Sequence, residues 1–393
     1  MVQHIGMKYR FKYFAFLFLP ATVLADNPTS ILKGNPTFST GMVGGPVVTG
    51  KYVNWQDGSP IFNYTTFRFG YIVPKGSSID MIFKSPQVGI GALIGHCERG
   101  FEFGNPVALY LYQGAKVKQF SEKISLDYLL SLGSIYMPVH YDPVRYPDKY
   151  MFGNGFNIFL SYDLNVVWRL SEKIDFKLGV NASHISNGNT REPNNGINNA
   201  GLLLGIAYRL ASDRNMTHDI FDPQVNNKKW VHDVAIISSS RNRSFIFPET
   251  EEEIFTKRSH HIWGVSYSAS YLLIRRLTTG LGAEFIYDNS AGVHLSDYTV
   301  IGENKVTGHV TKGPTSQRLC VSPLIIGEYA MPYYSIFLSL NYALFGGYGY
   351  EKKFHQVAGV KIPFSNGLYG AFGITAYNLS KAEHLYFALG IKI

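Results

Sequence analysis

Apolar and polar side chains alternate along most of this chain, in segments separated by turn-forming residues. In an extended strand, alternate side chains share one face, so such segments predict strands with one apolar and one polar face. The predicted strands are Tyr64–Val73, Ser77–Phe83, Val88–His96, Pro106–Val117, Ile124–Met137, Asn157–Leu170, Ile174–Ser186, Asn198–Leu210, His232–Ser238, His261–Ile274, Thr279–Tyr287, Arg318–Ala330, Tyr334–Leu344, Phe354–Ile362, Gly367–Tyr377 and His384–Ile393.

The last of these segments shows the pattern clearly. One face carries Leu385, Phe387, Leu389, Ile391 and Ile393, and no helical period is present. A terminal strand of this kind is typical of a β-barrel, which closes by pairing its last strand with its first. We therefore expect this strand to pair with the first strand of the chain.

The N-terminus has the features of an export signal. Basic residues Lys8, Arg10 and Lys12 precede an apolar stretch over 13–25 that ends in small residues. This order predicts a secretory signal peptide over 1–25, cleaved after Ala25, although an N-terminal anchor helix is an alternative. The following segment, 26–60, is rich in Gly, Pro, Asn and Thr and reads as a loop, with one possible strand near Ser39–Val48.

Composition favours a membrane protein over a water-soluble one. The chain is 46% hydrophobic and 15% aromatic, but only 16% of its residues are charged, against about 25% in soluble domains. Beyond the signal peptide no run approaches the ~18 apolar residues of a membrane helix. The sequence therefore predicts an all-β fold, a transmembrane antiparallel β-barrel over 61–393. A soluble periplasmic β-sandwich is the alternative.

The number of segments predicts a barrel of about 12–16 strands, with 14 as the best value, since such barrels keep an even count. Polar residues within 211–260 predict long loops around one short strand.

The formal net charge of +8 suits a surface beside anionic lipid phosphates. An exported chain is not expected to bind nucleic acid. Cys97 and Cys320 could pair in an oxidising compartment, but two buried free thiols fit equally well.

A polar cluster interrupts the apolar face of two neighbouring predicted strands. His184 and Ser186 end the apolar row that begins at Ile174, and Asn198 begins the corresponding row of the next strand. The three side chains therefore share one face. They either hydrogen-bond to one another as a structural cluster at the membrane–water interface, or His184 activates Ser186 as a nucleophile while a third group orients the imidazole ring.

The run His184-Ile185-Ser186-Asn187, with Pro193-Asn194-Asn195-Gly196 after it, resembles the signature of the lipid A deacylases called PagL. The resemblance implies an outer-membrane enzyme of Gram-negative bacteria that hydrolyses the ester-linked 3-hydroxyacyl chain at the 3-position of lipid A. It implies Ser186 as nucleophile and His184 as base. Asn187, with the backbone N–H of Gly188, is implied as the oxyanion site, without metal or organic cofactor.

The same resemblance places the site on the lipid-facing side of the barrel wall. The neighbouring apolar side chains Phe176, Leu178, Leu202 and Leu204 would then bind the acyl chain. The implied partners are lipid A or lipopolysaccharide and other outer-membrane lipids, and a homo-oligomer is possible.

Two features depart from the family pattern. Asn198 occupies the position of the family's catalytic Glu, so activity depends on whether an amide, or the nearby Glu192, replaces that carboxylate. The chain is also more than twice the length of the eight-stranded PagL enzymes. Outside 181–210 a weaker resemblance to large barrel proteins of the acyloxyacyl hydrolase type rests on Gly104-Asn105-Pro106, Gly153–Tyr162, Tyr350-Glu351-Lys352 and Lys381-Ala382-Glu383.

Two other functions stay open at this point. One is a non-catalytic outer-membrane barrel: a porin, a transporter for hydrophobic compounds or an anchor for an assembly. The other is an outer-membrane phospholipase, which would use the same Ser/His/Asn chemistry. The turn Pro193–Asn198 favours the deacylase.

Overall fold

A computed structural model describes residues 34–48, 59–74, 78–97, 104–142, 144–147, 149, 151–211, 229–246, 253–255, 259–274, 276–300, 306–350, 352–365, 367–379 and 381–393. The signal peptide expected over 1–25 lies outside these ranges.

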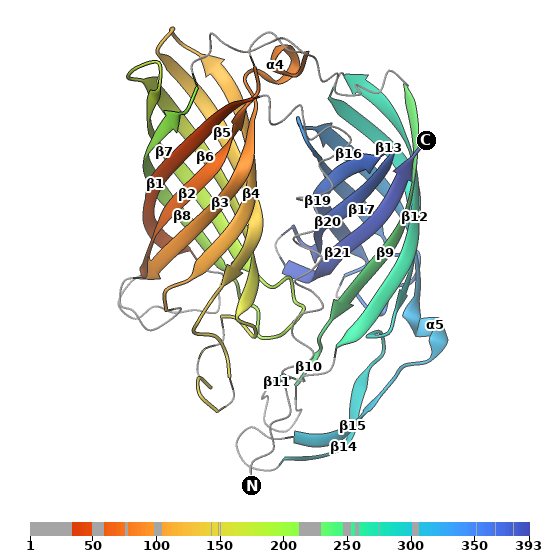
Figure 1. Cartoon of the computed structure of the whole chain (residues 1–393). Helices are drawn as coiled ribbons and strands as arrows, with labels where there is room; N and C mark the ends of the chain where they lie inside the picture. The colour runs from red at the N-terminus through yellow and green to blue at the C-terminus, as the bar shows by residue number, and fades with distance from the viewer. Residues whose placement is uncertain are drawn as a thin grey trace.

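The first eight strands form a closed antiparallel barrel (Figure 1). Each strand pairs with the next, and β8 closes the sheet by pairing with β1. The strands are β1 (Asn35–Val48), β2 (Ile61–Ile72), β3 (Gln87–Cys97), β4 (Val107–Gln119), β5 (Ile124–Tyr136), β6 (Phe156–Arg169), β7 (Ile174–Ser186) and β8 (Ile197–Arg209). A short helix, α4 (Ser78–Phe83), lies in the connection between β2 and β3.

A second antiparallel barrel follows and stands beside the first (Figure 1). It closes because β21 pairs with β9 and β13 pairs with β16. Its eight strands are β9 (Trp230–Arg241), β12 (His260–Ile274), β13 (Leu277–Asp288), β16 (Leu319–Ala330), β17 (Ser335–Tyr342), β19 (Phe354–Ser365), β20 (Leu368–Tyr377) and β21 (Lys381–Lys392). The smaller elements are β10 (Ser244–Ile246), β11 (Glu253–Phe255), β14 (His294–Val300), β15 (Val306–Thr311), α5 (Thr315–Arg318) and β18 (Phe345–Gly346).

The predicted fold class is confirmed, but the expected single barrel of 12–16 strands is replaced by two barrels of eight. The last strand, β21, pairs with β9 and not with the first strand of the chain. Alternation of side chains identifies a strand and its faces, whereas closure depends on which distant strand supplies the hydrogen bonds. The sequence pattern contains no information on that second point.

Three local expectations also change. The possible strand near Ser39–Val48 is present but longer than expected, since β1 of the first barrel spans Asn35–Val48 in a segment expected to be mainly loop. The segment predicted as the strand Ser77–Phe83 contains helix α4, because a short apolar run fits either structure and this one lies outside the sheet. In the region 211–260, β9 is a strand of 12 residues, and 212–228 lie outside the described residues.

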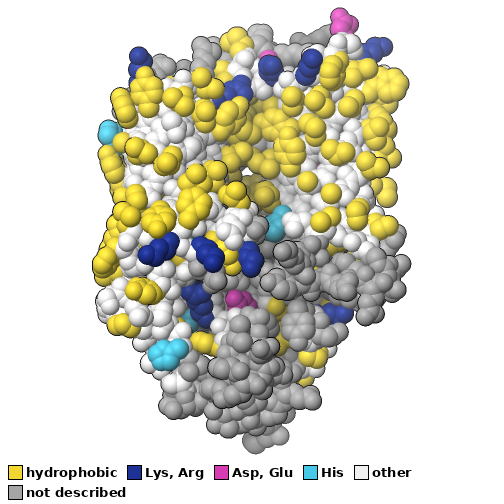
Figure 2. Space-filling model, turned by 180° about the vertical axis from the view of Figure 1, so that it is seen from behind, with side chains coloured by type: hydrophobic (Ala, Val, Ile, Leu, Met, Phe, Trp, Pro, Cys, Tyr) yellow, Lys and Arg dark blue, Asp and Glu magenta, His cyan; other side chains and the backbone are white. Residues whose placement is uncertain are grey.

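The outward faces of both barrels are apolar. Side chains that point away from the lumen include Leu202, Leu204, Ile236, Leu281 and Leu389, all more than half exposed. Figure 2 shows hydrophobic side chains over both barrels, with Lys and Arg gathered above and below them. A contiguous exposed apolar surface of this extent suits hydrocarbon and not water. Among the described residues, no helix has the length and apolar character needed to cross a membrane.

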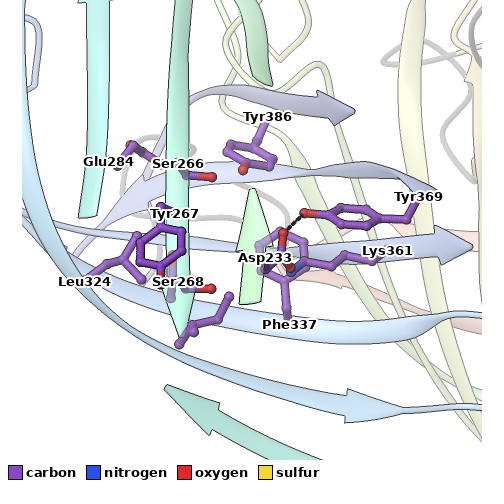
Figure 3. A pocket seen from close by; sticks show the side chains of 12 residues that line it. Asp233, Ser266, Tyr267, Ser268, Glu284, Leu324, Phe337, Lys361, Tyr369 and Tyr386 are labelled. Atoms are coloured by element: carbon purple, nitrogen blue, oxygen red, sulfur yellow. Dashed lines mark hydrogen bonds and ion pairs between the residues drawn. The ribbon is translucent and has the colours of Figure 1, made fainter. Parts of the chain in front are cut away.

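The lumens of the barrels are filled with polar and charged side chains. In the first barrel, Arg68 forms a buried ion pair of 2.9 Å with Asp163. In the second, Lys361 lies 2.6 Å from Asp233, which also accepts a hydrogen bond of 2.5 Å from the Tyr369 hydroxyl (Figure 3). These networks pair buried charges within each barrel, and a small cavity beside Asp233 and Lys361 lies in the second barrel (Figure 3).

The two barrels have the same orientation. At one end, short connections such as 120–123, 170–173, 331–334 and 366–367 join the strands. At the other end lie most of the longer connections, including 137–155, 187–196, 289–318 and 343–353, whereas 73–86 with α4 lies at the short-turn end. β8 ends and β9 begins at the short-turn end.

Direct contacts join the barrels. The Tyr128 hydroxyl of β5 lies 3.9 Å from Sδ of Met331 in the β16–β17 turn, and the Arg276 guanidinium lies 4.4 Å from the centre of the Phe83 ring. Gln113 faces outward from β4 yet is only 1% exposed.

Cys320 is buried as a free thiol in the second barrel, so it forms no disulfide with Cys97.

Candidate active site on the outer wall of the first barrel

The polar cluster found in the sequence lies where β7 ends and β8 begins. In the antiparallel register, His184 stands opposite Asn198, and Ile185 opposite Ile197. Both isoleucines point into the first barrel and are buried. His184, Ser186 and Asn198 therefore lie on the outer wall, as the alternation predicts, at the end of the barrel with the long connections.

These three side chains form a hydrogen-bonded row. Nδ1 of His184 lies 2.8 Å from Oδ1 of Asn198, and Nε2 of His184 lies 2.9 Å from Oγ of Ser186. Since a carbonyl oxygen only accepts, Nδ1 carries the proton and donates it to Asn198. Nε2 then has a free lone pair and accepts the hydroxyl proton of Ser186. This is the arrangement in which a histidine removes a proton from a serine.

The connection 187–196 folds back over the row and is held by the buried side chain of Asn187. Nδ2 of Asn187 donates to the backbone oxygen of Arg191 at 2.6 Å. The backbone N–H of Asn187 donates to Oδ1 of Asn194 at 2.9 Å. The residue predicted as an oxyanion donor thus has these two donors bonded within the loop. Asn194 is a residue whose supporting position the sequence did not reveal.

Two glycines in this connection adopt positive φ values, +60° at Gly188 and +65° at Gly196. A Cβ at Gly196 would lie 3.4 Å from Cβ of Ser186 and 3.6 Å from Cε1 of His184, so the backbone passes close to both side chains. In the described part of the chain, the backbone N–H of Gly188 meets no hydrogen-bond acceptor. That N–H is a candidate donor to an oxyanion.

Glu192, the alternative third group, is directed elsewhere. Its carboxylate lies 3.5 Å from Nδ2 of Asn189, and it interacts electrostatically with Arg243 of the second barrel. Burial lowers the pKa of the Arg243 guanidinium to about 10, and the negative charge of Glu192 acts in the opposite direction. The ring of His184 has Asn198 and Ser186 as its hydrogen-bond partners.

The predicted acyl-chain surface continues from the polar row along the same outer face. Leu178 stands opposite Leu204, and both are about half exposed. Leu202 is 70% exposed, and Phe176 is half-buried further along β7. Between His184 and this apolar surface stand the paired small residues Ala182 and Ala200. Their methyl side chains are the smallest in this part of the outer face, and the sequence alone does not show that the two alanines stand side by side next to Ser186 and His184.

The arrangement combines a serine hydroxyl, an imidazole with a fixed tautomer and an adjacent apolar surface. Such a site suits transfer of an acyl group from an ester whose hydrocarbon chain lies along the barrel wall. Within the described ranges, no group of three or more His, Cys, Asp or Glu side chains is arranged to bind a metal ion.

Comparison with solved structures gives distant similarities. The crystal structure of the outer membrane enzyme PagL is 13% identical; the match covers 43% of this chain and 97% of that one, with a TM-score of 0.32. The siderophore receptor PirA from Pseudomonas aeruginosa is 8% identical, over 92% of this chain and 81% of that one, with a TM-score of 0.28. An outer membrane channel from Pseudomonas putida F1 is 10% identical, over 93% and 98%, with a TM-score of 0.22. No curated protein matches the chain.

Family models match both barrels. Residues 85–207, within the first barrel, match the model described as lipid A 3-O-deacylase (PagL). Residues 234–393, within the second, match the model described as acyloxyacyl hydrolase, C-terminal domain (PagL_C). The chain therefore belongs to the PagL family, with a deacylase-type barrel followed by a barrel of the acyloxyacyl hydrolase C-terminal type.

Proposed function

We propose that this protein is an outer-membrane esterase that removes an ester-linked 3-hydroxyacyl chain from lipid A. The observation that carries the proposal is the hydrogen-bonded row of Ser186, His184 and Asn198 on the apolar outer wall. A channel or an anchor has no use for a base-activated serine, here buried beneath the connection 187–196 on the outer wall. An acyl chain in the membrane, however, already lies beside this wall.

The acylation step follows from the hydrogen bonds. Nε2 of His184 takes the proton of Ser186 as Oγ attacks the ester carbonyl carbon, and a tetrahedral oxyanion forms. The N–H of Gly188 and the second N–H of the Asn187 amide are the donors proposed for this oxyanion, each contributing about 3 kcal/mol. His184 then returns the proton to the leaving sugar oxygen as the ester C–O bond breaks, which leaves an acyl-serine.

Hydrolysis of the acyl-serine uses the same groups. His184 removes a proton from water, the hydroxide attacks the acyl carbonyl, and Ser186 regains its proton as the fatty acid leaves. During both steps the imidazole becomes positively charged. Asn198 fixes the ring orientation and the tautomer, but its neutral amide does not balance this charge as a carboxylate would.

The site and the substrate lie at the same depth under this proposal. Outer-membrane barrels place their short turns in the periplasm and their longer loops outside the cell. His184, Ser186 and Asn198 lie at the end of the long connections, which faces the outer leaflet where lipid A resides. The apolar row Phe176, Leu178, Leu202 and Leu204 is proposed to bind the acyl chain below them.

The test is the acylation pattern of lipid A in cells that express the protein. Mass spectrometry should show loss of one 3-hydroxyacyl group with the wild type. Ser186→Ala and His184→Asn should each abolish this loss while the barrel remains folded, because each removes one of the two groups that transfer the proton.

Two matched controls come from the same barrel. His96 on β3 also bonds to an asparagine, Asn105, at 3.1 Å, and Ser134 on β5 donates to a backbone oxygen. His96→Asn and Ser134→Ala should leave the deacylation unchanged. An unmodified lipid A pattern with abundant, folded wild-type protein would instead support a non-catalytic barrel.

A further inference from the structure

The second barrel touches the catalytic connection of the first. A Cβ placed on Gly188 would lie 2.1 Å from Cδ2 of Leu385 on β21 and 3.3 Å from Cδ1 of Ile374 on β20. Gly188 follows the nucleophile Ser186 by only two residues, and its side-chain position is filled by the neighbouring barrel.

Burial along β21 shows that this contact is local. Leu385 and Leu389 belong to the same outward row of the strand, yet Leu385 is 9% exposed whereas Leu389 is 57% exposed. Residues of the outer row should face lipid, as Leu389 does. The first barrel covers the row at Leu385, where Gly188 approaches it.

The charge of Glu192 in the same connection also acts weakly on the second barrel, at the guanidinium of Arg243. Arg243 itself donates a hydrogen bond of 2.6 Å to the backbone oxygen of Gly349. The packing contact at Gly188 is thus accompanied by a weak attraction of charges at Glu192.

Other parts of the connection are fixed from within the first barrel. Asn187 is bonded to Asn194 and to Arg191, and the backbone N–H of Gly153 donates to the oxygen of Pro193 at 2.5 Å. The Asn187–Gly188 peptide is bonded through its carbonyl, because the Asn187 oxygen accepts from the backbone N–H and the hydroxyl of Thr190. Its N–H, that of Gly188, has no acceptor in the described part of the chain, and the contacts with Leu385 and Ile374 hold it from the side of the second barrel.

We propose that β20 and β21 of the second barrel complete the active site of the first. Leu385 and Ile374 are positioning residues: they hold the Gly188 peptide so that its N–H points at the oxyanion formed from the Ser186 adduct. This inference rests on the proposed esterase function. It assigns the second barrel a part in catalysis, in contrast to a passive neighbour in the membrane.

The test compares Leu385→Ala and the double variant Leu385→Ala/Ile374→Ala with the wild type in the full chain. Loss of a positioned oxyanion donor should lower kcat on lipid A roughly 10- to 100-fold, because such a donor acts mainly in the transition state. The KM should change less than twofold. Leu385→Met, which keeps the volume of the side chain, should retain most of the activity.

Leu389→Ala is the matched control, since it removes the same atoms from the same strand and the same outer row. Folding of each variant is checked by heat-dependent gel mobility. If folded Leu385→Ala and the double variant are as active as Leu389→Ala, or if KM rises while kcat is constant, the positioning role is wrong.

A second measurement separates this inference from the proposed function. The rate at which a fluorophosphonate modifies Ser186, with release of fluoride, depends on the base and the oxyanion site but not on lipid A. If the fluorophosphonate modifies Ser186 of the wild type but the protein does not deacylate lipid A, the proposed substrate is wrong. The role of Leu385 can then still be tested by comparing the modification rates of the wild type and the Leu385 variants. If the wild type is neither modified nor active, both proposals are overturned.

Discussion

His184 is oriented by an amide at the place where the PagL pattern has a carboxylate. The 2.8 Å hydrogen bond from Nδ1 to Oδ1 of Asn198 fixes the ring as a carboxylate would. The difference lies in charge, because the imidazolium formed during catalysis is not neutralised. A slow enzyme with intact geometry is the expected consequence.

Asn198→Glu should therefore raise kcat, and Asn198→Leu should lower it. In serine proteases the exchange of the carboxylate for an amide lowers kcat by about 10⁴. For Asn198→Glu we expect kcat to rise by at least about tenfold. The gain is smaller than in the proteases because the exposed pair of residues 184 and 198 is partly hydrated, and water screens the added charge. Steady-state hydrolysis of a soluble ester by the purified protein measures both variants. An unchanged rate for Asn198→Glu would show that another group orients the imidazole ring or balances its positive charge.

The pairing of β7 with β8 turns an alternation along the chain into a continuous surface. Ala182 and Ala200 stand side by side between His184 and the larger apolar residues Leu178 and Leu202. Because their side chains are single methyl groups, we expect a shallow depression here, along which the first carbons of an acyl chain bound at Ser186 would run. The depression belongs to two strands and is invisible in either one alone.

Ala182→Phe should fill this depression without disturbing the fold, because the side chain faces lipid, where a phenyl ring is tolerated. Hydrolysis of long-chain esters should fall roughly tenfold, since the reacting carbonyl is displaced from the nucleophile. Hydrolysis of acetate esters should change less than twofold. Equal losses for short and long chains would contradict the depression as an acyl path.

The whole molecule consists of two barrels with the same orientation. Both start and end their sheets at the short-turn end, and both place most of their long connections at the other, although 73–86 with α4 lies at the short-turn end. Buried ion pairs such as Arg68–Asp163 and Lys361–Asp233 occupy the lumens of the two barrels. Catalysis is therefore expected on the outer walls and at the contact between the barrels, not in a channel.

The orientation can be tested with single cysteines in a variant without Cys97 and Cys320. Val144 lies in the β5–β6 connection at the long-loop end, and Lys123 lies in the β4–β5 turn at the opposite end. On intact cells, a maleimide that does not cross membranes should label Val144→Cys but not Lys123→Cys. Labelling in the reverse order would place the candidate site in the periplasmic leaflet and exclude the proposed substrate geometry.

Local pattern was enough to find the strands and the polar row of the site. Alternation gave β7 as Ile174–Ser186 and placed His184, Ser186 and Asn198 on one face, because the side-chain direction in a strand follows from the position in the chain alone. The signature around Ser186 gave the family for the same reason: its residues are close together in the sequence.

Closure and contact between barrels required the folded molecule. The pairing of β8 with β1 and of β21 with β9 depends on hydrogen bonds between strands far apart in sequence, and an outward strand face looks the same whichever partner closes the sheet. The approach of Leu385 to Gly188 joins positions almost 200 residues apart by packing of apolar atoms, which has no periodic signal. That contact, and with it the role of the second barrel, emerges only when both closed sheets stand side by side.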